Sequence, residues 1–213
     1  MSLSSKEAIL AAARRTAQAH GYSGLNFREL AAEVGIKAAS IHYHFPSKAD
    51  LGAAVAKRYW EDSAAVLEAL WAESLDPVHC LREYPNTFRK SLENGNRICL
   101  CSFMSAEYDD LPESVKKEVL AFADVNVRWL AKVLTAAAVV SAEESERRAR
   151  AIFAAVAGAQ LMARSRSDIS LYDVLIDGYR VAGLLPAYPV ESSLADALHK
   201  GRASKLPFAK RKR

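Results

Sequence analysis

Apolar positions recur every three to four residues along most of the 213-residue chain, the period of an amphipathic helix. Alternating strand patterns, and Asn-Gly or Asp-Gly hairpin turns joining such strands, do not occur. The pattern therefore predicts an all-α fold. Helices are expected over residues 4–19, 27–34, 38–45, 47–74, 77–94, 98–110, 112–138, 141–165 and 168–184.

Local capping signals set several of these boundaries. Asn26 is expected to cap the second helix, with Glu29 three residues later as its capping-box partner. Gly35 ends that helix, and Ser47 caps the long helix that follows Pro46. Further start signals are Pro77, Pro112, Ser141 and Asp168.

Charge divides the chain into three parts. Residues 1–60 hold eight Lys and Arg against four Asp and Glu, a net charge of +4. Residues 61–185 hold 14 against 19, a net charge of −5, and residues 186–213 hold seven against two, a net charge of +5. A basic N-terminal segment, an acidic middle and a basic tail indicate that a polyanion is contacted at one end of the molecule.

Two short helices flanking a glycine turn are typical of the helix-turn-helix, whose second helix enters the DNA major groove. In the stretch GIKAASIHYHF, residues 35–45, Ile41 and Phe45 lie four positions apart and are expected to face inward. The polar side chains between and before them can then meet bases and phosphates. The alternative is that HYHF forms a buried aromatic cluster.

The same residues resemble the DNA-binding domain of the TetR/AcrR family of bacterial transcriptional regulators, whose pattern is similar to IA..AGVS.GTLY.HF..K..L. This sequence reads LAAEVGIKAASIHYHFPSKADL over residues 30–51, and the resemblance extends over roughly the first 60 residues. Asn26 stands where the family usually has a threonine cap. Lys37 replaces the serine that usually caps the recognition helix, so that helix start is expected to be satisfied differently.

The resemblance implies a DNA-binding domain over residues 1–50 and an effector-binding and dimerisation domain over 51–185. Residues 186–213 lie beyond the family pattern, and their composition predicts a flexible, basic tail. Residues expected to face bases are Lys37, Ala38, Ala39 and Ser40. Residues expected to hold phosphates or to flank these contacts are Arg28, His42, Tyr43, His44 and Lys48.

The segment RICLCSFMSAEYDDLP, residues 97–112, resembles the NemR-like subset of the family, in which a cysteine near the start of this helix precedes a similar stretch. Cys99 would occupy that place as an electrophile sensor, with Arg97 close enough in sequence to lower its thiol pKa. The alternative is an inert, buried cysteine. A zinc site built from His79, Cys80, Cys99 and Cys101 lacks the usual CxxC spacing, and no metal or cofactor is expected.

Other residues could line an effector pocket, because such sites are mostly apolar. The candidates are Cys101, Phe103, Phe122 and Trp129, for which ordinary core packing is the alternative. Small residues over 151–159 allow close helix approach, and the resemblance implies a homodimer through the last two helices, residues 141–184. Packing within one chain is the alternative there.

These observations together predict a homodimeric repressor released from a palindromic DNA operator by a small-molecule or electrophile effector. A DNA-binding protein without an effector is the alternative. An enzyme is not expected, because the sequence carries no phosphate-binding glycine loop, HExxH motif or G-x-S-x-G elbow. The longest apolar runs fall short of a membrane span and no signal peptide opens the chain, so a cytoplasmic location is expected.

Overall fold

The computed structural model describes residues 4–188, and every regular element in that range is helical. The predicted all-α fold is therefore confirmed. The helices are α1 (Ser5–His20), α2 (Phe27–Val34), α3 (Ala38–His44), α4 (Lys48–Ser74), α5 (Pro77–Glu93), α6 (Leu100–Ala106), α7 (Glu113–Ala136), α8 (Ala142–Arg166) and α9 (Ile169–Val181). Among residues 4–188, none of these helices is long and apolar enough to cross a membrane. All but the first three residues of the predicted basic tail lie outside the described residues.

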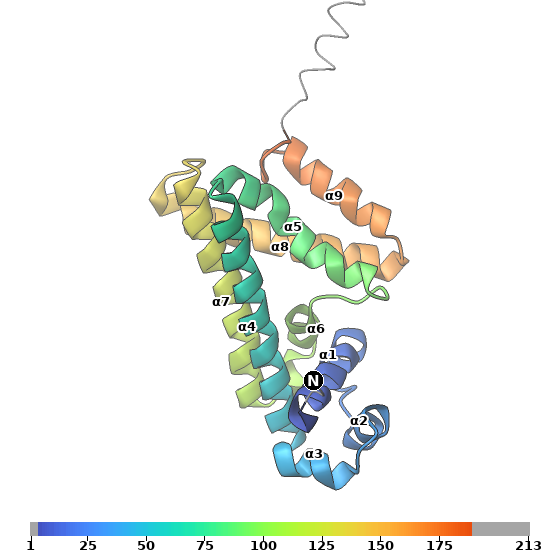
Figure 1. Cartoon of the computed structure of the whole chain (residues 1–213). Helices are drawn as coiled ribbons and strands as arrows, with labels where there is room; N and C mark the ends of the chain where they lie inside the picture. Colours follow the sequence, from blue (N-terminus) through green and yellow to red (C-terminus); the bar gives the residue numbers. More distant parts are fainter. Residues whose placement is uncertain (1–3, 189–213) are drawn as a thin grey trace, which may run out of the picture.

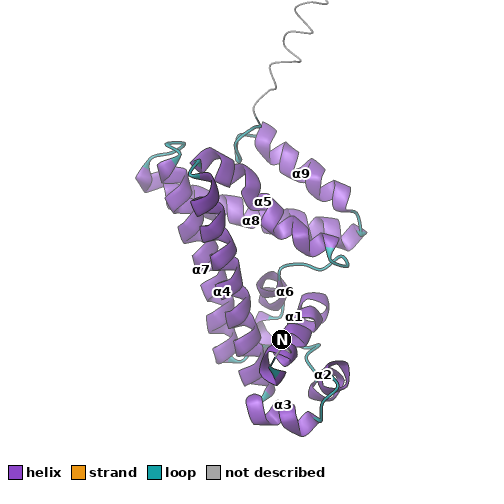
Figure 2. Ribbon diagram, viewed as in Figure 1, coloured by secondary structure: helices purple, strands orange, loops and turns teal. Residues whose placement is uncertain are grey.

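Helices α1 to α3 form a small bundle at one end of the molecule (Figures 1 and 2). Helices α4 and α7 run side by side away from this bundle, and α5, α8 and α9 lie across their far ends. The short helix α6 packs against α1, α4 and α7, between the bundle and the far helices. The predicted boundary between residues 50 and 51 falls in the first turn of α4, so one continuous helix leads from the bundle into the larger helical part.

Helix starts follow the local signals read from the sequence. The Ser47 side chain accepts a hydrogen bond from the Asp50 backbone, and the Asp50 carboxylate accepts one from the Ser47 backbone, completing a capping box. Ser141 and Asp168 cap α8 and α9 through their side-chain oxygens. These bonds satisfy amide groups that have no partner inside the helix.

Two helices are shorter than the pattern predicts. The helix expected over 98–110 begins after Cys99 and ends at Ala106, and a separate 3₁₀ turn covers Tyr108–Asp110. The carboxylates of this acidic turn are unfavourable at a helix C-terminus, which already carries partial negative charge. The helix expected to reach residue 184 ends at Val181, shortly before Gly183 turns the chain with a φ of 73°.

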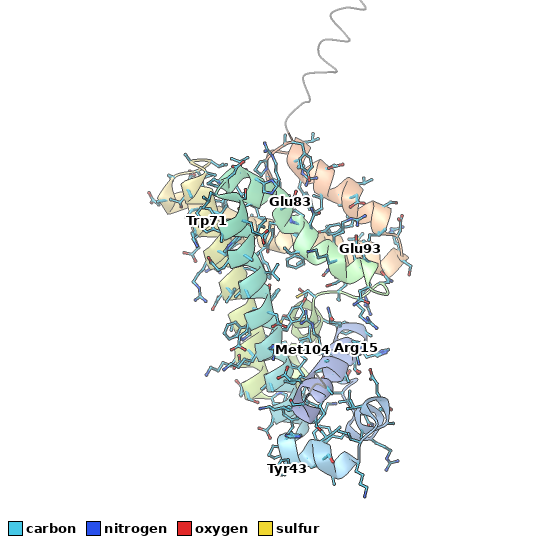
Figure 3. All side chains as sticks on the ribbon, in the orientation of Figure 1. Arg15, Tyr43, Trp71, Glu83, Glu93 and Met104 are labelled. Atoms are coloured by element: carbon cyan, nitrogen blue, oxygen red, sulfur yellow. The ribbon has the colours of Figure 1, made fainter. Side chains whose placement is uncertain are left out.

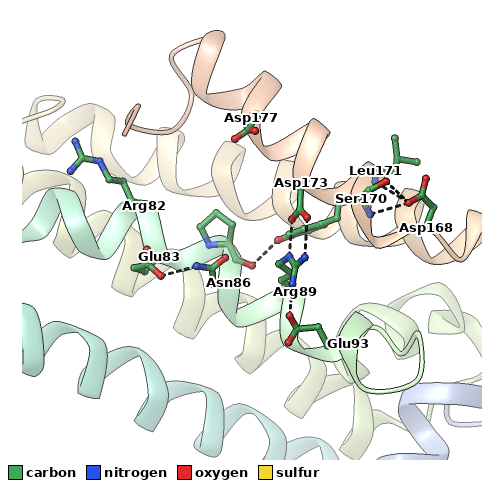
Figure 4. A network of polar contacts seen from close by, with 12 residues as sticks. Arg82, Glu83, Asn86, Arg89, Glu93, Asp168, Ser170, Leu171, Asp173 and Asp177 are labelled. Carbon is green, nitrogen blue, oxygen red and sulfur yellow. Dashed lines mark hydrogen bonds and ion pairs between the residues drawn. The ribbon is translucent and has the colours of Figure 1, made fainter. Parts of the chain in front are cut away.

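A polar network fastens α9 to α5 (Figure 4). Arg89 donates two hydrogen bonds to the Asp173 carboxylate and also pairs with Glu93. The buried hydroxyl of Tyr172 donates to the backbone oxygen of Pro85 at 2.7 Å. Because these bonds are directional, they fix how α9 lies across α5.

Candidate nucleic-acid interface

The turn between α2 and α3 has the geometry that its sequence predicts. The Asn26 side-chain oxygen accepts hydrogen bonds from the backbone N–H groups of Arg28 and Glu29 and so caps α2. Gly35 ends α2 in the left-handed region, with φ 75° and ψ 33°. The Ile36 N–H then donates a hydrogen bond to the Ala31 carbonyl oxygen, 3.0 Å away. This bond ends α2 before the chain continues into α3.

Helix α3 divides into a buried and an exposed face. Ile41 is 0% exposed and Phe45, its C-cap, is 3% exposed, so both belong to the core shared with α1 and α2. Tyr43 is 85% exposed and points outward at the end of the molecule (Figure 3). The HYHF segment is therefore not a buried cluster; only its phenylalanine enters the core.

The candidate DNA-contacting residues do not all have free side chains. Arg28 and Lys37 are exposed, and neither forms an ion pair within residues 4–188. His42 packs against the ring of Phe27, with ring centroids 4.7 Å apart. Lys48 donates to the backbone oxygen of Ser23 at 2.9 Å and so already has a partner in the free protein.

The remaining candidates complete a surface of mixed chemistry. Ala38 and Ala39 are exposed at the start of α3, while Ser40 and His44 are half-buried. Lys37, the N-cap of α3, makes no side-chain capping bond, as its replacement of the usual serine predicts. Cations and hydroxyl donors suit phosphate oxygens, and exposed methyl groups suit a thymine methyl.

Comparison with known proteins assigns this arrangement. The sequence profile described as "Bacterial regulatory proteins, tetR family" matches residues 9–55, which span α1 to the start of α4. A TetR transcriptional regulator from Legionella pneumophila is 31% identical, with a TM-score of 0.78; the match covers 82% of this chain and 95% of that one. The chain belongs to the TetR family. It is accordingly a DNA-binding transcriptional regulator with a TetR-type helix-turn-helix.

Other TetR-family structures agree with this assignment. A TetR-family regulator from Agrobacterium tumefaciens is 30% identical, with a TM-score of 0.75 and coverage of 80% of this chain and 92% of that one. The reduced form of NemR from E. coli is 19% identical, with a TM-score of 0.73 and coverage of 88% and 100%, so that likeness concerns the fold. No curated protein sequence matches the chain. TetR-family proteins are regulators rather than enzymes.

In this TetR-family protein, the predicted sensor Cys99 and the predicted pocket residue Cys101 are both buried. Cys99 and Cys101 are each 1% exposed. Burial raises the pKa of the Cys99 thiol and raises that of Cys101 further, because a thiolate is poorly solvated there. The Arg97 guanidinium, which the sequence predicted to lower this pKa, instead binds the backbone and side-chain oxygens of Asn94. Residues 4–188 contain no cluster of three or more His, Cys, Asp or Glu that could hold a metal.

Of the three aromatic residues predicted to line an effector pocket, Phe122 and Trp129 pack against other rings. Phe122 lies within 6.4 Å of Tyr59, Phe88 and Phe153, measured between ring centroids. Trp129 is 4% exposed and borders a hollow of 200 Å³ between α4 and α7. Phe103 is half-buried beneath a guanidinium from α8. Phe122 is thus a core residue in this structure, whereas Trp129 also meets a hollow.

An open cleft of 470 Å³ lies between α1, α4 and α5. Arg14 and Gln18 from α1, Tyr59 from α4 and Lys90 from α5 contribute to its walls. A second hollow of 640 Å³ between α4 and α5 continues from it and shares Lys90. Because α1 belongs to the DNA-binding bundle, a ligand in the first cleft would contact both parts of the protein.

Apolar side chains remain exposed along α8 and α9. Leu161 and Met162 on α8 are 57% and 47% exposed. Val174 and Val181 on α9 are 66% and 91% exposed. Contiguous apolar surface is typical of interaction sites, whereas single exposed apolar residues are common on monomers.

Two residues with important contacts have no local signal in the sequence. Glu107 follows α6 and binds backbone amides after α1, while Arg164 on α8 binds backbone carbonyls at the end of α1. Their partners lie 84 to 146 residues away in the chain. Helical periodicity describes neighbours three or four positions apart, so it cannot reveal such contacts.

Proposed function

We propose that this TetR-family regulator is a homodimeric repressor that leaves a palindromic operator when an effector binds its helical domain. The observation that carries this proposal is the division of α3, where Ile41 and Phe45 are buried and Lys37, Ala38 and Tyr43 are exposed. A helix anchored in this way can enter the major groove without losing its packing.

The expected division of labour on DNA follows the side-chain chemistry. Lys37, Ala38, Ala39 and Ser40 face bases at the start of α3. Arg28, Tyr43 and His44 hold phosphates and fix the register, and His42 flanks them from its place on Phe27. Lys48 reaches a phosphate only if it exchanges its bond to Ser23 for one to DNA.

The exposed apolar face of α8 and α9 supports a homodimer. Gly158 and Gly178 on these helices have open space where a Cβ would stand, so another helix can approach closely. One seven-residue recognition helix reads few bases, whereas a two-fold dimer places two such helices in successive major grooves. Burying Leu161, Met162 and Val174 would supply apolar contact area.

The cleft between α1, α4 and α5 supports a non-covalent effector. Its lining combines a tyrosine ring with the polar groups of Arg14, Gln18 and Lys90, as ligand sites often do. Burial raises the pKa of the Cys99 thiol. As a sensor, Cys99 would therefore react slowly unless the thiol first became exposed. The fold shared with NemR keeps the electrophile sensor as the second candidate.

Selection of bound sequences from randomised duplex DNA tests the operator and the dimer together. The wild-type protein is expected to enrich a palindrome, and Leu161→Asp should lose the palindrome preference because a carboxylate enters the dimer face. Leu120→Asp on α7, also exposed, is the matched control and should behave as wild type. Enrichment of a non-palindromic site, or equal loss in both variants, would contradict the proposed dimer.

Release from DNA is then measured on the enriched duplex at fixed salt. Dissociation by a thiol-reactive electrophile that fails in Cys99→Ser would establish the cysteine sensor. Dissociation by a non-covalent compound that fails in Tyr59→Ala would place the effector in the cleft, provided that this variant still binds DNA. A protein that no compound releases would match the alternative without an effector.

A further inference from the structure

The C-terminal end of α1 is held by residues from the larger helical part of the molecule. Helix α1 ends at His20, and Gly21 turns the chain with φ 72° and ψ −167°. The loop over residues 22–24 then leads to the cap of α2. Two charged side chains from distant parts of the sequence bind this short region, one directly after α6 and one on α8.

Glu107 binds the amide side of the loop. Its carboxylate accepts hydrogen bonds from the backbone N–H groups of Tyr22 at 2.5 Å and Ser23 at 3.0 Å. A Cβ on Gly21 would overlap this carboxylate, so glycine is needed there both for its backbone angles and for the close approach. Hydrogen bonds to an ionised carboxylate are among the stronger ones in proteins.

Arg164 binds the carbonyl side of the same region. Its guanidinium donates to the backbone oxygen of Ala19 at 2.9 Å and, less closely, to that of Gln18 at 3.4 Å. It also donates to Asn96 in the loop before α6 and lies over the ring of Phe103, 5.2 Å from its centroid. A cation at the last carbonyls of a helix complements the helix dipole.

Neighbouring side chains extend the same junction. The amide of Gln18, 7% exposed, donates to the Ile98 carbonyl at 3.2 Å. One turn before Arg164 on α8, the buried Gln160 accepts from the Cys99 N–H and donates to the Phe88 carbonyl. The end of α1, the segment before α6 and helix α8 are therefore joined by directional polar bonds.

The junction also reaches the candidate DNA interface. Ser23 gives its N–H to Glu107, and its carbonyl accepts from Lys48. The other helices of the bundle follow α1, because α2 and α3 pack on it around Leu30 and Ile41. A shift of α6 or α8 would thus move the recognition helix.

From this geometry we infer that Glu107 and Arg164 are positioning residues for DNA recognition. The Glu107 carboxylate binds backbone N–H groups after α1, and the Arg164 guanidinium binds backbone carbonyls at the end of α1. Together these two side chains hold the bundle of α1 to α3 in one orientation relative to α6 and α8. In the proposed homodimer, on which this part of the proposal rests, the orientation of each bundle sets the spacing of the two recognition helices. Helix α8 carries Arg164 and the exposed Leu161, so dimerisation and bundle orientation share one helix.

The orientation is measured without DNA by pulsed electron paramagnetic resonance. Spin labels go on Tyr43→Cys in α3 and Asp124→Cys in α7, both exposed positions, and labelled protein is diluted with unlabelled protein to isolate distances within one chain. Wild-type contacts predict one narrow distance distribution. Glu107→Gln with Arg164→Met should broaden it about twofold or add a second distance.

Matched controls are Glu113→Gln and Arg166→Met. Glu113 is an exposed acid near the start of α7, and Arg166 is an exposed residue two positions after Arg164 on the same helix. Both should leave the distribution as in the wild type. Melting curves of all variants separate a loosened bundle from an unfolded one, and an unchanged distribution in the double variant would overturn the inference.

The second test measures DNA affinity, using unlabelled protein and the duplex that the wild-type protein enriches. The double variant should lose about tenfold in affinity for the palindrome while its affinity for a single half-site changes less than about twofold. Equal losses on both duplexes, or none, would overturn a positioning role in recognition. If the wild-type protein prefers no duplex, the proposed function fails, and the distance distribution alone still decides whether these residues fix the orientation.

Discussion

Arg89 on α5 and Asp173 on α9 form a two-bond ion pair, with N···O distances of 2.7 and 2.9 Å. The hydrogen bond from Arg89 holds the pKa of the Asp173 carboxyl below its usual range. Because the proposed dimer face includes α9, this pair also fixes the helix that presents Val174 to a second chain.

Asp173→Asn should therefore lower stability in a pH-dependent way. A depressed carboxyl pKa in the folded state contributes stability that is present above the unfolded pKa and is lost as pH falls through the folded one. The pair is partly exposed, so we expect a loss of about 0.5–1 kcal/mol at about pH 7 and a smaller difference from wild type at about pH 3, where protonation of the carboxyl begins to remove the ion pair. Urea unfolding at both pH values measures this loss.

The matched control for that prediction is Asp177→Asn, one turn further along α9. Asp177 pairs with Arg180 at 2.7 Å within the same helix, and its side chain is 69% exposed. Its loss should cost less than that of Asp173 because no second helix is held. An equal effect of the two substitutions would show that the Arg89 contact does not stabilise the packing of α9.

On α3, Tyr43→Ala should affect DNA binding, whereas Ile41→Ala should affect folding stability. Tyr43 is 85% exposed, so its loss should leave unfolding unchanged within about 0.5 kcal/mol while weakening operator binding. Ile41 is fully buried, and its truncation should cost about 2–4 kcal/mol through lost packing. Paired chemical denaturation and DNA titration test both, and a large stability loss in Tyr43→Ala would contradict the exposed placement.

Gly35→Ala and Gly21→Ala should lower the free energy of unfolding by different amounts, although both glycines have positive φ. Gly35 has open space where a Cβ would stand, so alanine there should cost about 1 kcal/mol from its left-handed backbone alone. Gly21 has φ 72° and ψ −167°, a region nearly restricted to glycine, and alanine would also displace Glu107. Denaturation should rank Gly21→Ala as the more damaging substitution, and the reverse order would argue against the Glu107 contact.

The thiols of Cys99 and Cys101 should react slowly with an alkylating reagent in the folded protein. Burial raises the pKa of both, so little thiolate is present at neutral pH and the reagent has poor access. Mass spectrometry after iodoacetamide treatment should show rapid modification of an exposed control, Ser167→Cys, and modification of the native cysteines only after denaturant is added. Rapid labelling of Cys99 in folded protein would favour the electrophile sensor.

Local signals in the sequence predict most of the fold. Asn26, Ser47 and Asp168 cap their helices with side chains that reach only two or three residues ahead, so their role is readable without tertiary structure. The same holds for Gly35 and for the spacing of Ile41 and Phe45. These features also identify the candidate DNA interface.

Long-range contacts account for what the sequence did not predict. The role of Glu107 depends on amides in the loop after α1, and Arg164 reaches α1 from the far end of α8. Phe122 is a core residue by its ring contacts, yet its sequence pattern would be the same if it lined a pocket. Apolar periodicity identifies a buried face and does not reveal what fills the space beside it.

Sequence-specific DNA recognition by the exposed face of α3 is tested most directly by one equilibrium titration. The purified protein is titrated at fixed salt with the DNA upstream of its own gene and with a scrambled duplex of equal length, because phosphate contacts alone depend steeply on salt. We predict tighter binding to the native duplex by at least about a hundredfold, with two chains per duplex. Equal affinity for both duplexes would contradict sequence-specific recognition of that DNA.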